Sequence, residues 1–123
     1  MTDTAQADWS VRAGNSGTVE NEGGLVFRLL ESDAVTPRDL TGATFVCRMT
    51  DATGASVLRK DAATGLTVDL PKAEVVVPIT VAESRLLHAA AKPVQYDLER
   101  RQGSDQRTEI GGTIFTMPGS NDD

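Results

Sequence analysis

Three sets of residues in this sequence belong to types that perform chemistry in proteins. Cys47 is the only cysteine and His88 is the only histidine, so a nucleophilic triad would have to use His88 as its base. Asp97 and Glu99 are two residues apart in "YDLE". On a strand, this spacing places two carboxylates about 6–7 Å apart on one face, a separation compatible with glycoside cleavage.

Structural roles are favoured for all three sets. Cys47 lies at an apolar position of an alternating segment, where a small thiol suits the inner side of a sheet. His88 lies in an alanine-rich segment, and the chain contains no Gly-x-Ser-x-Gly elbow. A glycosidase needs an aromatic platform for its sugar, whereas this chain has one Trp, one Tyr and three Phe. We therefore interpret Asp97 and Glu99 as a solvated acidic face.

Metal and cofactor sites have equally little support in the sequence. One Cys and one His exclude multi-cysteine zinc sites and His-paired motifs. No loop has the acidic spacing of a calcium-binding EF-hand, and "GNSG" and "EIGG" lack the lysine and helix of a phosphate-binding loop. We predict no catalytic residue, no cofactor and no metal.

Segments that alternate between apolar and polar residues recur along the chain, with turn signals between them. In the clearest of them, Phe45, Cys47 and Met49 share one face. The others are "DWSVRAG" (8–14), "GGLVFRLLES" (23–32), "ASVLRK" (55–60), "LTVDL" (66–70), "EVVVPITV" (74–81), "VQYDLERR" (94–101) and "RTEIGGTIFTM" (107–117). Short alternating runs at this density predict an all-β, immunoglobulin-like sandwich of about seven to nine short antiparallel strands.

One segment has a helical signal instead. Thr80 and Glu83 have the spacing of a capping box, and the segment stops before a proline. This predicts one short helix near residues 81–91. We expect Leu86 and Leu87 to face the core from it.

Charge and hydropathy exclude two classes of partner. The formal net charge is −6 and the pI is about 4.7, so a phosphate backbone would be repelled. We interpret Arg59–Lys60 and Arg100–Arg101 as solvated strand ends, not as basic patches. No run approaches the roughly 18 apolar residues of a membrane span, and the first residues lack the pattern of a secretory signal. We expect neither nucleic acid nor a membrane as partner.

Four stretches carry a resemblance to a known family: "DLTGATFVCRMTDATGASVL", "TGLTVDL", "EVVVPITVAESRLL" and "VQYDLERRQGSDQRTEIGGTIFT". The resemblance extends over about Leu25 to Met117. The order of the four stretches resembles a β-sandwich domain of tailed-bacteriophage virion proteins. The chain is similar to the N-terminal domain of baseplate upper proteins and to related tail or fibre-attachment modules.

The resemblance implies a non-enzymatic structural protein of the virion, assembled in the host cytoplasm. It would act as an adaptor or attachment module in the tail, baseplate or fibre-anchoring region, with other virion proteins and further copies of the chain as partners. Two alternatives stay open. One is a capsid-surface protein, either a head decoration or the base of a head fibre. The other is a carbohydrate-binding module for host attachment, although a glycan partner is not favoured.

We divide the chain into an N-terminal arm (1–14), a β-sandwich domain (15–117) and a polar tail (118–123). Trp9 and Val11 alternate with polar residues in the otherwise polar arm. Either the arm docks on its own domain, or it anchors a neighbouring subunit. In the second case Trp9, Val11 and Arg12 bind the partner, and the fold survives removal of the arm.

Overall fold

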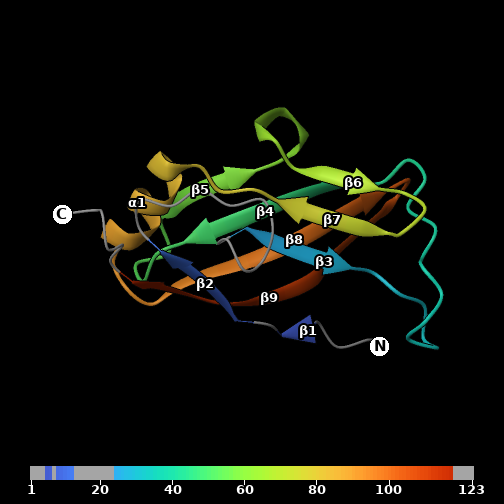
Figure 1. Cartoon of the computed structure of the whole chain (residues 1–123), viewed down its shortest axis with the longest axis horizontal. Coiled ribbons are helices and arrows are strands. Elements are labelled where there is room, and N and C mark those ends of the chain that lie inside the picture. Colours follow the sequence, from blue (N-terminus) through green and yellow to red (C-terminus); the bar gives the residue numbers. More distant parts are fainter. Residues whose placement is uncertain (1–4, 7, 13–23, 118–123) are drawn as a thin grey trace.

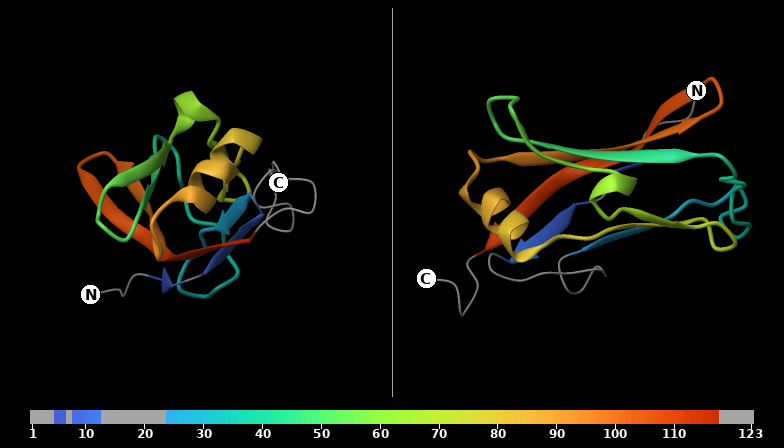
Figure 2. Two further views of the ribbon diagram at one scale, coloured as in Figure 1. Left: turned by 90° about the vertical axis from the view of Figure 1, so that its left-hand side faces the viewer. Right: turned by 90° about the horizontal axis from the view of Figure 1, so that it is seen from above.

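The structure is a computed structural model that describes residues 5–6, 8–12 and 24–117. In chain order the described elements are β1 (Ala5–Gln6), β2 (Trp9–Arg12), β3 (Leu25–Arg28), β4 (Thr44–Thr50), β5 (Ser56–Lys60), the 3-10 helix η2 (Ala62–Thr64), β6 (Thr67–Asp69), β7 (Glu74–Val77), α1 (Val81–Ala89), β8 (Val94–Gln102) and β9 (Asp105–Met117). The strands form two sheets that lie face to face, with α1 at one end (Figures 1 and 2).

The strand order is that of an immunoglobulin-like sandwich. In that fold, strands A, B, E and D form one sheet and C, F and G the other, and variable-type domains add C′ beside C. The smaller sheet here, β3-β7-β6, has strands at the B, E and D places. In the larger sheet, β9-β8-β4-β5 occupies the G, F, C and C′ places. The predicted fold class is therefore confirmed, with nine strands in the described part of the chain.

Two strands depart from the predicted antiparallel pairing. β1 and β2 both run parallel to β9, with Ala5 opposite Ile110 and Trp9 opposite Ile114. Every other strand pair in the described ranges is antiparallel. Alternation within a strand indicates which face is apolar, but it says nothing about the direction of the neighbouring strand. The parallel pairing could not be foreseen for this reason.

The core lies between the sheets and is built from the inward positions of the alternating segments. Phe45, Cys47 and Met49 are at most 3% exposed, as predicted. Two inward assignments are wrong. Leu70 is expected to face inward with Leu66 and Val68, but it is 49% exposed because β6 ends one residue earlier and a turn begins there. Leu86 is 53% exposed because its neighbour Leu87 takes the inward position of α1 and is fully buried.

The helix α1 begins at the predicted cap. Thr80 Oγ1 accepts a hydrogen bond from the Glu83 backbone N–H (3.1 Å), and the Glu83 carboxylate accepts one from the Thr80 N–H (2.9 Å). The helix ends at Ala89, two residues before the predicted end. It lies at one end of the sandwich, where it contacts β5 on one side and β2 and β9 on the other (Figure 1).

Candidate protein-interaction site

Cys47 packs inside the core. It lies opposite Leu98 of β8 and Lys60 of β5, and none of it is exposed. Burial raises the pKa of the thiol to about 12, an effect that Asp97 increases and Lys60 opposes. Because the thiolate is the nucleophilic form, this thiol is inert at neutral pH. The structural interpretation of Cys47 is confirmed.

His88 makes a hydrogen bond that joins two elements. Its Nδ1 lies 3.0 Å from Oγ1 of Thr116, which belongs to β9. Lys92 Nζ donates to the backbone carbonyl of His88 at 2.6 Å, near the end of α1. The imidazole thus helps to hold the helix against the larger sheet.

Asp97 and Glu99 are not a solvated acidic face, and this interpretation is wrong. Glu99 accepts hydrogen bonds from Arg101 (2.6 Å) and Arg48 (3.2 Å), and 12% of its side chain is exposed. The bond from Arg101, above all, lowers the pKa of Glu99, whereas burial raises the pKa of Asp97 against the opposing effect of Arg48. The two pKa values move apart, as they do in acid–base pairs. Both carboxylate oxygens of Glu99 nevertheless accept hydrogen bonds from guanidinium groups, those of Arg101 and Arg48. Glu99 therefore takes part in ion pairs on the surface of the sheet.

Lys60 is not a solvated strand end either, because only 2% of it is exposed. Its Nζ donates to both carboxylate oxygens of Glu83, at 2.8 and 3.0 Å. Burial alone would raise the pKa of Glu83, but the hydrogen bonds from Lys60 and Thr80 outweigh it and the pKa is lowered. The ion pair joins β5 to the first turn of α1. Its neighbour Arg59 is exposed, as predicted.

Arg100 is a second buried cation that the sequence interpretation missed, with 7% of it exposed. It donates to Asp105 (2.9 Å), Glu109 (3.3 Å) and Gln102 (2.8 Å). Glu109 also accepts a hydrogen bond from Arg38. The β8–β9 pairing shifts register so that it skips Glu109, which places this carboxylate beside both arginines. The network ties the loop before β4 to the β8–β9 hairpin, at the end of the sandwich away from α1 (Figure 1).

Within the described ranges, no three His, Cys, Asp or Glu side chains are grouped so that they could hold a metal ion. No helix in those ranges has the length and apolar character needed to cross a membrane. The side chains capable of chemistry that are described above instead join elements of the sandwich.

β2 docks on the sandwich much as a bound peptide would. Trp9 and Val11 are 2% and 1% exposed and belong to the core cluster. The Trp9 ring meets the Tyr96 ring edge-on, with centroids 5.6 Å apart and planes at 83°. Nearby, the Asp8 carboxylate accepts a hydrogen bond from the Thr113 backbone N–H at 3.2 Å. Backbone pairing, two buried side chains and a polar contact therefore hold the strand.

The surface that receives β2 is formed by three elements. The edge of β9 from Ile114 to Met117 supplies the backbone pairing, and α1 lies in contact with β2. The His88–Thr116 hydrogen bond fixes α1 to that same stretch of β9. Tyr96 of β8 lies against the Trp9 ring. We name this surface, made of residues 114–117, Tyr96 and α1, the strand slot.

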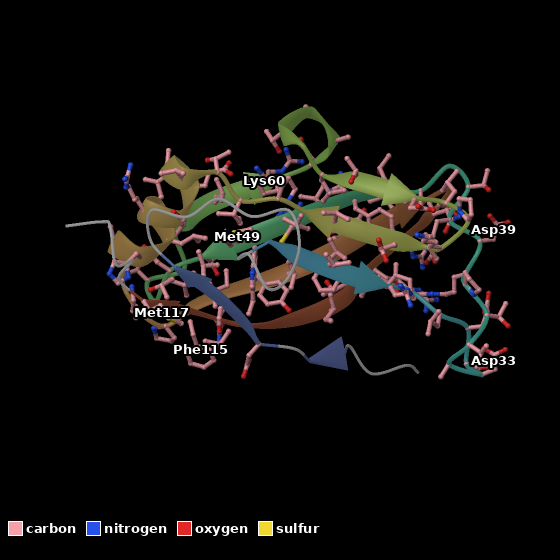
Figure 3. The ribbon with its side chains drawn as sticks, in the orientation of Figure 1. Asp33, Asp39, Met49, Lys60, Phe115 and Met117 are labelled. Carbon is pink, nitrogen blue, oxygen red and sulfur yellow. The ribbon has the colours of Figure 1, made fainter. Side chains whose placement is uncertain are left out.

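The outer side of the same strands presents an exposed aromatic residue. Phe115 is 53% exposed and stands opposite Ser10 of β2, which is also exposed. Figure 3 shows Phe115 and Met117 at the margin of the molecule, whereas Met49 and Lys60 lie inside it. Phe115 and Trp9 are therefore two aromatic residues on neighbouring strands, one outside and one inside.

Of the two interpretations of the arm (1–14), the structure has the first, in which Trp9 and Val11 dock on their own chain. The expectation that the fold survives removal of this segment belongs to the second interpretation and stays untested; because both side chains lie in the core, we expect removal to destabilise the sandwich. The predicted binding of a partner by Trp9, Val11 and Arg12 stays a prediction, and it requires β2 to leave the slot of its own chain. The domain boundary after residue 14 and the tail (118–123) lie outside the described residues.

Comparison with known proteins gives no family. No protein-family model matches the chain, and no curated protein matches it. Among solved structures, it is similar to the extracellular fragment, including the stalk region, of novel immune-type receptor 11 from Ictalurus punctatus. The identity is 12% over 100% of this chain and 91% of that chain, with a TM-score of 0.37. A TM-score this low carries no argument, so the fold assignment rests on the strand order.

Proposed function

We propose that the chain is a non-enzymatic structural protein of a tailed-phage virion. It acts through protein–protein contacts as an adaptor or attachment module in the tail, baseplate or fibre-anchoring region. The observation that carries the non-enzymatic part is that Cys47, His88, Lys60 and Glu99 are all engaged in packing, hydrogen bonds or ion pairs of the sandwich. The sequence resemblance from residue 25 to residue 117 supports the virion part.

The sandwich suits an assembly role because ion pairs stabilise both of its ends. The Lys60–Glu83 pair fixes α1 at one end, and the Arg38–Glu109 pair fixes the loop before β4 at the other. A rigid surface loses little conformational entropy when it binds. In a particle that holds many copies, a weak single contact is sufficient.

Particles produced from the genome that encodes this chain provide the test. We expect peptides of the chain in gradient-purified particles, and we expect gold-labelled antibody on the tail or baseplate in electron micrographs. A chain that is abundant in the infected cell but missing from particles would contradict the proposal. A glycan array with the purified protein tests the carbohydrate-binding alternative, and we expect no binding there.

A further inference from the structure

We propose that β2 is exchanged between copies of the chain, so that the strand slot of one copy receives Trp9–Arg12 of a second copy. This inference rests on the proposed function, because it names the partner and the contact by which the protein assembles. It unites the two interpretations of the arm: the residues that dock within one chain are the residues that dock on a neighbour.

The contacts that hold β2 are the same whichever copy supplies the strand. Among the described residues they include the parallel backbone pairing with β9, the Trp9–Tyr96 ring contact and the hydrogen bond from Thr113 to Asp8. None of them depends on the residues that connect β2 to β3. Exchange of an identical element therefore preserves the contact energy, which makes it a low-cost route to assembly.

β2 also has few backbone pairings to break. Within the described residues it pairs with β9 and with no other strand, whereas β4 pairs on both sides, with β5 and β8. Parallel pairing is slightly weaker per residue than antiparallel pairing, and this pairing spans four residues. Withdrawal of β2 breaks this short ladder and also takes Trp9 and Val11 out of the core, so the emptied slot is stable only when β2 of a second copy fills it.

The connection between β2 and β3 is long enough to reach a neighbour. Residues 13–23 read "AGNSGTVENEG". Eleven residues can span at most about 36–40 Å, which exceeds the roughly 26 Å given by twice the radius of gyration of a 100-residue domain.

In the closed form β2 docks on its own chain, and in the exchanged form it docks on a second copy. The concentration of the chain determines which form is favoured. The closed form avoids the cost of association, about 4–15 kcal/mol at the 1 M standard state. Attachment of many copies to one particle raises their effective concentration and offsets that cost. We therefore expect closed monomers in dilute solution and exchanged strands at high concentration.

Cross-linking between strands tests the exchange. Ser10 and Phe115 stand opposite each other and are both exposed, so Ser10→Cys and Phe115→Cys put two accessible thiols within reach of a short bis-thiol cross-linker. A tagged Ser10→Cys chain and an untagged Phe115→Cys chain are refolded together at high concentration and then cross-linked. Cys47 does not compete, because it is buried and its pKa is raised.

Exchange predicts a tagged–untagged product at least tenfold more abundant than the product from a control pair. The control combines Phe115→Cys with a tagged chain carrying Ala63→Cys, an exposed position on η2. Adding Trp9→Ala to the tagged Ser10→Cys chain should remove the product. The inference is overturned if the mixed pair yields no more than the control while the double variant Ser10→Cys/Phe115→Cys cross-links within one chain.

The cross-linking experiment and the particle test of the proposed function can give different answers. A chain that is found on particles but never cross-links between copies retains its assembly role and loses the exchange. A chain that exchanges strands but is missing from particles retains the exchange and loses the virion role.

Discussion

Replacing Trp9 with alanine is expected to lower the free energy of unfolding by about 3–5 kcal/mol. The indole is 2% exposed, and it packs edge-on against Tyr96 inside the core cluster. Its removal leaves a cavity between β9, α1 and Tyr96 and loses the aromatic contact. Urea denaturation followed by circular dichroism measures the change without relying on the lost fluorophore.

Phe115→Ala is the matched control for this prediction. Phe115 is also aromatic and lies on the strand next to β2, but it is 53% exposed on the outer face. We expect a change within about 0.5 kcal/mol, as for surface substitutions in general. If Trp9→Ala is as harmless as Phe115→Ala, β2 is not docked in the strand slot.

Replacing Glu83 with glutamine is expected to cost about 3 kcal/mol of stability. Lys60 is 2% exposed, so loss of the carboxylate leaves a buried ammonium without its counter-ion. Glutamine can still accept from the Thr80 N–H in the capping box, so the variant removes the charge and keeps the cap. We take the lower end of the usual range of about 3–5 kcal/mol because 18% of the Glu83 side chain is exposed.

A second substitution and an exposed ion pair provide the controls. Lys60→Met added to Glu83→Gln should recover most of the loss, because the buried charge is then gone. Arg59→Gln breaks the neighbouring pair with Asp61, in which 51% of the arginine side chain is exposed. We expect that change to cost less than about 1 kcal/mol. Equal effects of Glu83→Gln and Arg59→Gln would contradict the role of Lys60 as a buried cation.

The same ion pair predicts a pH dependence of stability. The pKa of Glu83 is lower in the folded chain than its ordinary value, so ionised Glu83 stabilises the fold at neutral pH. This stabilisation is lost as pH falls below the unfolded pKa of about 4.3 and through the folded value. We therefore expect the stability difference between the wild type and Glu83→Gln to shrink between about pH 7 and pH 3. A difference that stays constant would mean that the effect of the variant is not electrostatic.

The alternation of apolar residues was sufficient to predict the sandwich, and it failed where an inward position is charged. In β4 the apolar positions are the buried ones, so the two layers follow from the sequence. Lys60 and Arg100 occupy inward positions of their strands, but a cation next to a turn is typical of an exposed strand end. Their partners Glu83 and Glu109 are 23 and 9 residues away, one on a helix and one at a register shift. No pattern within a single strand connects them.

Of the candidate site, the residues that dock could be predicted from the sequence, whereas the surface that receives them could not. Trp9 and Val11 stood out as anchors because they alternate in an otherwise polar segment. Their receptor surface lies about one chain length away, since Asp8 bonds to Thr113 across 105 residues. A local sequence pattern cannot show whether β2 docks on the β9 edge of its own chain or on the β9 edge of another copy, because the contacts are the same.

Docking of β2 in the strand slot is tested most directly by the fluorescence of the wild-type chain, in which Trp9 is the only tryptophan. We predict blue-shifted emission and strong protection from acrylamide quenching in the native protein, both lost in denaturant. Emission and quenching of the native chain that match those of the unfolded chain would place Trp9 in water. That result would contradict the docked strand and, with it, the exchange.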